Sequence, residues 1–184
     1  PVFGSINAVY PDTWVKYAKL VEGTGVAGLE LNFFNVPFDM EKSSDDIENE
    51  QLDIVRSVLK AVKIPVSVKL SRFYTNPLKM VKKLSDLGVK GVILFNKLFQ
   101  PDIDLENQKH STPWNLSSPD EYRLALRYAG ILYDEVESDI IASTGIFTGK
   151  DMIKLLLVGA DSVQIVSTLY KNGVNQISEM LLDL

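Results

Sequence analysis

The sequence predicts an α/β fold, a (β/α)8 TIM barrel of which this chain holds about six βα units. Three observations support the prediction. Strand-like and helix-like segments alternate along all 184 residues, as they do in a parallel sheet covered by helices. A glycine, a short turn and a β-rich run recur together, beginning at Gly25, Gly88 and Gly159. Nearly every predicted strand also carries polar side chains on one of its two faces.

The alternation sets the order of the elements. Strands are predicted at 2–8, 28–34, 65–71, 91–96, 139–144 and 162–167, and helices at 11–23, 45–62, 77–87, 119–134, 149–158 and 171–183. Asn76-Pro77 places proline at the first position of one helix, and Ser118-Pro119-Asp120-Glu121 is typical of a capping box. No low-complexity linker divides the chain, so residues 1–184 are predicted to be a single domain.

One long connection stands apart from this pattern. Residues 100–116 are polar and include His110 and Trp114. Long connections of this kind are often lids over a site. A disordered surface loop is the other interpretation, and both stay open at this point.

The polar strand faces favour a barrel over a doubly wound sheet. In a barrel, inward side chains near the carboxyl ends of several strands converge on one mouth, whereas a doubly wound sheet concentrates function at a switch point. The inward set comprises Ser5, Asn7, Glu30, Asn32, Ser67, Lys69, Asn96, Ser143 and Gln164. Alternate positions are apolar, as an outer face against helices requires. Because a complete barrel takes about 250 residues, two further units are expected before Pro1.

Composition excludes several classes of function. The net charge of -5 and the pI near 4.9 argue against an extended nucleic-acid or anionic-membrane surface. There is no cysteine and one histidine, so thiolate or histidine-rich metal sites are excluded and no metal is expected. No apolar run approaches the roughly 18 residues of a membrane span. The absence of cysteine also fits a reducing compartment, and a cytoplasmic protein is expected.

Seven segments carry a family resemblance. They are Ser5-Ile6-Asn7, Glu30-Leu31-Asn32, Val68-Lys69-Leu70-Ser71, Leu94-Phe95-Asn96, Ser117-Ser118-Pro119, Thr144-Gly145-Ile146-Phe147-Thr148-Gly149 and Val163-Gln164-Ile165-Val166-Ser167-Thr168. In order and spacing they resemble the FMN-binding barrel of the dihydroorotate and dihydropyrimidine dehydrogenase family. The similarity runs from about residue 2 to residue 175. It implies that residues 1–184 form the later part of such a barrel.

The resemblance implies an FMN-dependent oxidoreductase of pyrimidine metabolism that transfers hydride between a dihydropyrimidine-like substrate and flavin. Asn7, Asn32 and Asn96 match the substrate-reading asparagines, and an amide offers both the donor and the acceptor that a pyrimidine edge requires. Lys69 matches the lysine beside the flavin ring, where an ammonium stabilises the negative charge of the reduced flavin. Glu30 is interpreted as structural, accepting hydrogen bonds that orient Lys69 or a loop. The partners implied are a pyrimidine-like small molecule and a second copy in a homodimer.

The remaining cofactor-binding residues implied lie at the phosphate end. They are Ser118, Thr144, Gly145, Ser167 and Thr168. Barrels commonly hold phosphate after their last two strands, with backbone N–H groups. The family usually has two glycines at Thr144-Gly145 and a glycine at Ser118. Both differences place side chains where the backbone approaches the ligand.

One departure concerns the catalytic base. The family has Cys or Ser three residues after the motif asparagine, and counting from Asn32 that position is Asn35. An amide does not remove a proton at useful rates. The sequence therefore leaves two alternatives to a working dehydrogenase. One is a Schiff-base aldolase or synthase that uses Lys69 on a phosphorylated substrate, and the other is a flavin-binding homologue without catalysis.

Overall fold

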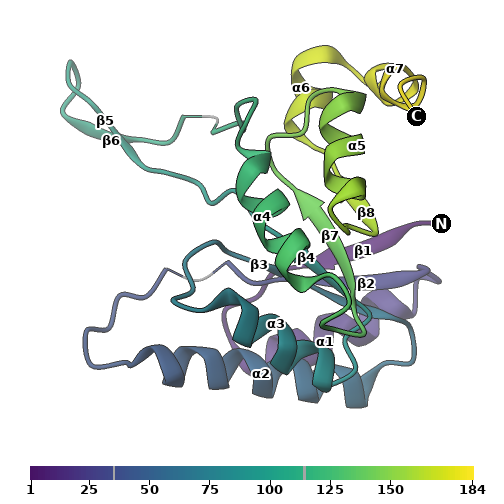
Figure 1. The fold of residues 1–184 in the computed structure, drawn as a ribbon. Coiled ribbons are helices and arrows are strands. Elements are labelled where there is room, and N and C mark those ends of the chain that lie inside the picture. The colour runs from purple at the N-terminus through teal and green to yellow at the C-terminus, as the bar shows by residue number, and fades with distance from the viewer. Residues whose placement is uncertain (35, 114) are drawn as a thin grey trace.

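The computed structural model describes residues 1–34, 36–113 and 115–184. Its strands are β1 (Phe3–Ile6), β2 (Gly28–Asn32), β3 (Val66–Leu70), β4 (Gly91–Leu94), β5 (Asp102–Asp104), β6 (Lys109–Ser111), β7 (Asp139–Ser143) and β8 (Ser162–Gln164). Its helices are α1 (Pro11–Glu22), α2 (Ser44–Ala61), α3 (Pro77–Asp86), α4 (Tyr122–Leu132), α5 (Gly149–Leu157), α6 (Ser167–Asn172) and α7 (Gln176–Leu181). Apart from the β5–β6 hairpin, strands and helices alternate as predicted (Figure 1).

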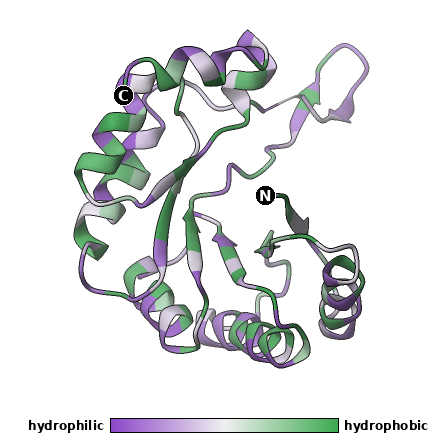
Figure 2. Cartoon of the chain, turned by 90° about the vertical axis from the view of Figure 1, so that its right-hand side faces the viewer, coloured by the Kyte–Doolittle hydropathy of each residue, from purple (hydrophilic) through white to green (hydrophobic). Residues whose placement is uncertain are grey.

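One parallel sheet organises the molecule. Its strand order is β1-β2-β3-β4-β7-β8, so strands that follow one another in the main alternation are neighbours in the sheet. Every adjacent pair is parallel. The sheet curves, and the helices cover its outer side (Figure 2). A doubly wound sheet would reverse its strand order at a switch point, so the structure confirms the prediction of a partial TIM barrel.

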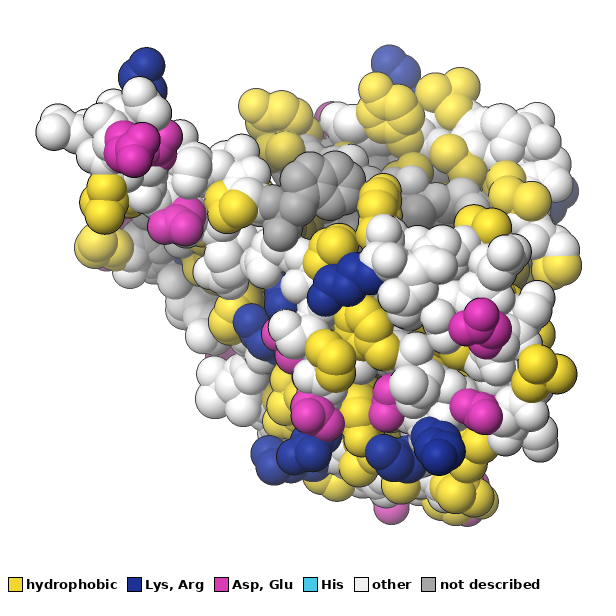
Figure 3. All heavy atoms as spheres, turned by 90° about the horizontal axis from the view of Figure 1, so that it is seen from above, with side chains coloured by type: hydrophobic (Ala, Val, Ile, Leu, Met, Phe, Trp, Pro, Cys, Tyr) yellow, Lys and Arg dark blue, Asp and Glu magenta, His cyan; other side chains and the backbone are white. Residues whose placement is uncertain are grey.

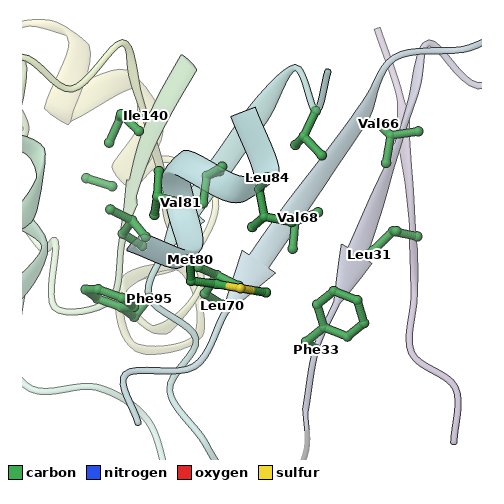
Figure 4. Close-up of a cluster of buried hydrophobic side chains, with 14 of the residues drawn as sticks. Leu31, Phe33, Val66, Val68, Leu70, Met80, Val81, Leu84, Phe95 and Ile140 are labelled. Atoms are coloured by element: carbon green, nitrogen blue, oxygen red, sulfur yellow. The ribbon is translucent and has the colours of Figure 1, made fainter. Parts of the chain in front are cut away.

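The outer face of the sheet forms the apolar core. Leu31, Val68 and Leu70 have no exposed surface, and neither do Met80 and Leu84 of α3, which pack against these strands (Figure 4). Burying a side chain of this kind contributes about 1.5–3 kcal/mol. The outer face therefore supplies much of the stability, which leaves the inner face available for polar groups.

The predicted glycine turns are confirmed. Gly25, Gly88 and Gly159 follow α1, α3 and α5 and have φ of 82, 93 and 110 degrees. These left-handed values are unfavourable for residues with a Cβ atom. Each glycine therefore ends one helix and turns the chain toward the next strand.

Two of the predicted helices differ in their bounds. The helix predicted at 119–134 begins only at Tyr122, and Ser118 does not cap it, because Asp120 has a left-handed φ of 74 degrees that interrupts the first turn. The helix predicted at 171–183 corresponds to α7 and the last two residues of α6, which begins earlier, at Ser167; Gly173, whose φ is 80 degrees, separates the two helices. At Asn76-Pro77 the prediction is correct: the Asn76 side chain accepts a hydrogen bond from the Lys79 amide at 3.2 Å.

The connection 100–116 contains an antiparallel hairpin. β5 pairs with β6 so that Ile103 lies opposite His110. The Asp104 carboxylate closes the turn by accepting hydrogen bonds from the backbone N–H groups of Glu106 and Asn107, at 3.0 and 3.1 Å. The hairpin projects from the body of the molecule (Figures 1 and 3). The sequence analysis did not predict these two strands.

Candidate functional site

A cavity of about 280 Å³ lies at the carboxyl ends of β3, β4, β7 and β8. Its described lining residues are Lys69, Asn96, Lys97, Asn115, Leu116, Ser117, Ser143, Thr144, Gly145, Ile146, Gln164, Ile165, Val166 and Ser167. The list contains two lysines, four hydroxyl side chains and neither Asp nor Glu. In a chain with a net charge of -5, this composition favours an anionic ligand.

The β strands bring a chain of polar side chains into the interior. The Lys69 ammonium donates to the Gln164 carbonyl oxygen at 2.6 Å, and the Gln164 amide donates to Glu30 Oε2 at 2.9 Å. Ser5 Oγ donates to the other Glu30 oxygen at 2.7 Å. Glu30 is only 7% exposed, so these two hydrogen bonds satisfy a buried carboxylate. The expectation that Glu30 accepts hydrogen bonds is met, and Gln164 links it to Lys69.

Burial and charge act on Lys69 in opposite directions. Removal from water lowers the pKa of the Lys69 ammonium below its ordinary value, and the nearby Glu30 carboxylate partly offsets this effect. The second lysine of the cavity differs, because Lys97 Nζ lies 2.8 and 2.9 Å from the two carboxylate oxygens of Glu121. Among the described residues that line the cavity, Lys69 is therefore the cation whose charge is not neutralised by direct contact with a carboxylate.

The three predicted substrate-reading asparagines lie together. Asn96 Nδ2 donates to Asn32 Oδ1 at 2.8 Å, and Asn7 Nδ2 donates to the backbone oxygen of Asn32 at 2.9 Å. In the sheet register, Asn32 is also the partner of Lys69. Asn96 lines the cavity, while Asn7 and Asn32 lie beside it on the β1 and β2 side. The parallel register therefore places Asn32 next to the lysine, and hydrogen bonds join Asn7 and Asn96 to Asn32.

The turn after β7 has an unusual backbone. Thr144 and Gly145 have φ of 80 and 77 degrees. A left-handed conformation is unfavourable for a β-branched residue, and the Thr144 hydroxyl compensates by donating to the Phe95 carbonyl at 2.7 Å. The Gly145 amide donates to Ser117 Oγ at 3.1 Å. The family's preference for two glycines at these positions thus has a direct backbone reason.

Ser117 connects the phosphate-end segments that were predicted from sequence. Its backbone N–H donates to Ser167 Oγ at 2.8 Å, which joins the segment before α4 to the start of α6. Ser167, Thr144 and Gly145 all line the cavity. Two other predicted cofactor residues do not: Ser118 is exposed, and Thr168 is fully buried and accepts a hydrogen bond from Asn172.

Several cavity residues were missed by sequence reasoning. Lys97 carries a signal, since it directly follows the motif asparagine Asn96. Ser117 stands beside the chosen Ser118 in the same motif. Asn115 lies after the β5–β6 hairpin and donates to the Leu98 carbonyl at 3.2 Å, a placement that no local pattern indicates. Asn35, the position matched to the family base, lies outside the described residues.

Comparison with known proteins settles the family. The family model described as dihydroorotate dehydrogenase matches residues 1–184, the whole chain. The chain belongs to the dihydroorotate dehydrogenase family. Members of this family are oxidoreductases built on a TIM barrel, in agreement with the parallel sheet and its outer helices.

Curated relatives of this family member include archaeal enzymes. The chain is 31% identical over 185 residues to the dihydroorotate dehydrogenase B (NAD(+)) catalytic subunit of Thermoplasma volcanium, covering 98% of this chain and 60% of the relative. It is 29% identical to the protein of the same name from Methanocaldococcus jannaschii, covering 94% and 57%. A putative dihydroorotate dehydrogenase A (fumarate) of Aeropyrum pernix is 29% identical, with 90% and 55% covered. The chain thus spans somewhat more than half the length of these relatives.

Among the described residues, no helix of this family member combines the length and the apolar character needed to cross a bilayer.

Proposed function

We propose that this protein is an FMN-dependent oxidoreductase acting on CH–CH groups, with a dihydropyrimidine-like substrate. The observation that carries the proposal is the single cavity in which Lys69 and Asn96 meet the hydroxyl-rich segments at Ser117, Thr144 and Ser167. Membership of the dihydroorotate dehydrogenase family supports the reaction class. The catalytic-subunit names of the relatives favour work alongside a second protein, and pyrimidine metabolism in the cytoplasm is the proposed setting.

The donor set of the cavity fits FMN. The Ser117 and Ser167 hydroxyls accept hydrogen bonds from backbone N–H groups, so their own O–H groups remain as the neutral donors that a phosphate accepts from. Small-molecule sites typically measure about 300–1,000 Å³, and the cavity of about 280 Å³ lies close to the lower end of this range. We propose that Lys69, Thr144, Gly145 and Ser167 hold the cofactor. Ser118 and Thr168 keep this role only if ligand binding rearranges their segments.

Lys69 provides positive charge at a defined atom. Bound FMN supplies a hydride acceptor and gains negative charge when reduced. The Lys69 ammonium, held by Gln164 at the cavity wall, is placed to stabilise such charge without moving. The low polarity that lowers the Lys69 pKa also strengthens this electrostatic effect, because charges interact more strongly away from water.

The asparagine cluster supports a cyclic amide as substrate. Asn32 Oδ1 is occupied by Asn96, which directs the Asn32 NH2 group and the Asn96 carbonyl oxygen away from that bond. Together they form a neighbouring donor and acceptor, the complement of an N–H and C=O pair on a pyrimidine ring. Asn7 fixes the position of Asn32 through its backbone oxygen. Proton removal from substrate carbon is the step for which the chain has Asn35 at the family position, so slow turnover is expected.

Cofactor reconstitution tests the proposal. The full-length protein is stripped of small molecules and titrated with FMN, with FAD and with riboflavin, and flavin fluorescence and absorption are recorded. FMN should bind more tightly than riboflavin, because the hydroxyl-rich end engages phosphate. Lys69→Met should weaken binding of the reduced cofactor more than that of the oxidised one, while the exposed control Lys79→Met should change neither. Equal binding of FMN and riboflavin would contradict the phosphate assignment.

One observation favours the alternative function, a Schiff-base aldolase or synthase that uses Lys69. Burial lowers the Lys69 pKa, which raises the fraction of free amine available to attack a carbonyl carbon. Borohydride treatment in the presence of small phosphorylated aldehydes and ketones distinguishes the two functions. A stable adduct on Lys69 together with no flavin binding would favour an aldolase or synthase. Flavin binding with no turnover of dihydroorotate would favour the homologue without catalysis.

A further inference from the structure

We infer that Gln164, oriented by Glu30, is a positioning residue that directs the Lys69 ammonium toward the cavity while keeping the compensating carboxylate one side chain away. The use of this ammonium on a cofactor rests on the proposed function, but the arrangement itself rests on geometry. Gln164 belongs to β8, whereas Lys69 and Glu30 belong to β3 and β2. Since β8 is at the other edge of the sheet, Gln164 reaches them across the concave interior.

The chemistry of its neighbours allows Gln164 only one orientation. Glu30 Oε2 accepts a hydrogen bond from the Gln164 NH2 group at 2.9 Å, and the carboxylate can only accept. The Lys69 ammonium can only donate, so at 2.6 Å it must face the Gln164 carbonyl oxygen. Reversing the amide would set donor against donor and acceptor against acceptor. Glu30 therefore determines which group Gln164 presents to the lysine.

This arrangement keeps the lysine available to a ligand. An ammonium has three N–H donors, and within the described residues Lys69 Nζ has one hydrogen-bond partner, the Gln164 oxygen. Lys97 shows the contrast, since both oxygens of Glu121 lie against its ammonium. The amide thus acts as a spacer between Lys69 and Glu30. The Glu30 carboxylate balances the charge of Lys69 from a distance. The other N–H donors of the Lys69 ammonium remain available to a ligand in the cavity.

Among the described residues, two ionisable side chains are near Lys69 or line its cavity. Glu30 faces it from β2 through Gln164, and Lys97 lines the same cavity from the segment after β4, paired with Glu121. The Glu30 charge opposes the effect of burial on the Lys69 pKa. Removing that charge while keeping the hydrogen bonds should therefore make Lys69 easier to deprotonate.

The experiment measures this protonation directly and requires no flavin. Full-length protein is labelled with trace acetic anhydride across a pH series, and acetylation of Lys69 is quantified by mass spectrometry against the exposed Lys79 as internal reference. In Glu30→Gln, the amide at position 30 can still accept from Gln164 and pair with Ser5, but its charge is gone. Lys69 acetylation at a given pH should rise about tenfold. Ser5→Ala keeps the charge, and should change acetylation less than about threefold.

An exchange variant gives a test in the opposite direction. Combining Glu30→Gln with Gln164→Glu preserves composition and net charge but moves the carboxylate into direct contact with Lys69. The hydrogen bonds between residues 5 and 30, 30 and 164, and 164 and 69 can all still form. We therefore expect the exchange variant to fold even if Glu30→Gln alone prevents folding. Lys69 acetylation should then fall at least about threefold below that of the wild type.

The ranking of the three proteins decides the inference. Acetylation that is highest in Glu30→Gln, intermediate in the wild type and lowest in the exchange variant supports it, because a merely structural role would alter stability without producing this order. Equal acetylation of Lys69 in folded wild-type and exchange proteins would overturn it. Failure to bind FMN would instead count against the proposed function, since the labelling series does not depend on the cofactor.

Discussion

Replacing Gly145 with alanine tests whether the turn after β7 is packed as tightly as the structure indicates. A Cβ atom at position 145 would lie 2.5 Å from the Tyr122 backbone nitrogen and 2.8 Å from the Glu121 carbonyl carbon. Real Cβ atoms essentially never approach other heavy atoms this closely. Because these neighbours are backbone atoms at the start of α4, they cannot move aside as a flexible side chain would. The turn and the helix must separate.

The expected cost has two parts. The φ of 77 degrees at Gly145 costs an alanine about 1–2 kcal/mol, and forcing an extra carbon into a packed region costs about 1–3 kcal/mol. Gly25 supplies the matched control, since its φ is 82 degrees and nothing lies within 4 Å of a Cβ placed there. Gly25→Ala should show the first part alone. Gly145→Ala should therefore lose about 1–3 kcal/mol more than Gly25→Ala in the free energy of unfolding.

Urea denaturation of the two variants and the wild type measures this difference, provided the slopes remain equal. The cavity gives a second readout, because the Gly145 amide holds Ser117 Oγ and both residues line it. We expect FMN to bind Gly145→Ala more weakly and Gly25→Ala normally. If the two variants unfold at the same urea concentration, the contact between this turn and the start of α4 is not as close as described, and the reasoning fails.

Three further predictions concern single groups. In Asn96→Asp an acceptor replaces the NH2 group that donates to Asn32 Oδ1, so the free energy of unfolding should fall by about 1–3 kcal/mol. Asn7→Asp is the comparison for a more exposed amide. An unchanged urea midpoint in Asn96→Asp would contradict the hydrogen bond. Because burial lowers the Lys69 pKa, the unfolded chain binds more protons than the folded protein between that lowered value and about 10.4. The free energy of unfolding should therefore rise with pH through this window in the wild type relative to Lys69→Met. Equal changes in the two proteins between pH 8 and pH 10, measured by urea unfolding, would refute this. Asn35→Cys should raise the rate of dihydroorotate oxidation by part of the roughly 10²–10⁴-fold that a general base supplies. Asn35→Ala is the control. Fast turnover by the wild type would show that another residue is the base.

The fold was predictable because its signals are local. Glycine at positions 25, 88 and 159 ends helices in a conformation that other residues avoid, and alternation of polar and apolar residues tells the two faces of each strand apart. The inward phase of Glu30 and Lys69 followed from the same alternation. These features depend on residues a few positions apart, so the sequence displays them directly.

What escaped prediction depends on backbone conformation or on distant parts of the chain. Asp120 adopts a left-handed φ that shortens α4, a conformation that aspartate tolerates but that the local sequence does not require. The β5–β6 hairpin lacks an alternating apolar pattern, and so it resembled a loop. The choice of Ser117 rather than Ser118 as a cavity residue depends on the hydrogen bond to Ser167, fifty residues away in sequence. Neighbouring serines offer no local basis for that choice.

The link between Gln164 and Glu30 also has a consequence for how the protein folds. The sheet can grow by adding each strand to the preceding one, so most pairings join segments that are close in the chain. The Gln164–Glu30 hydrogen bond instead spans 134 residues, and the Gln164–Lys69 bond spans 95. Neither can form until β8 has joined the sheet and the sheet has curved. We therefore expect the environment of Lys69 to be established late in folding, after most of the ladder is complete, so that a chain with native-like helix content can still lack its binding site.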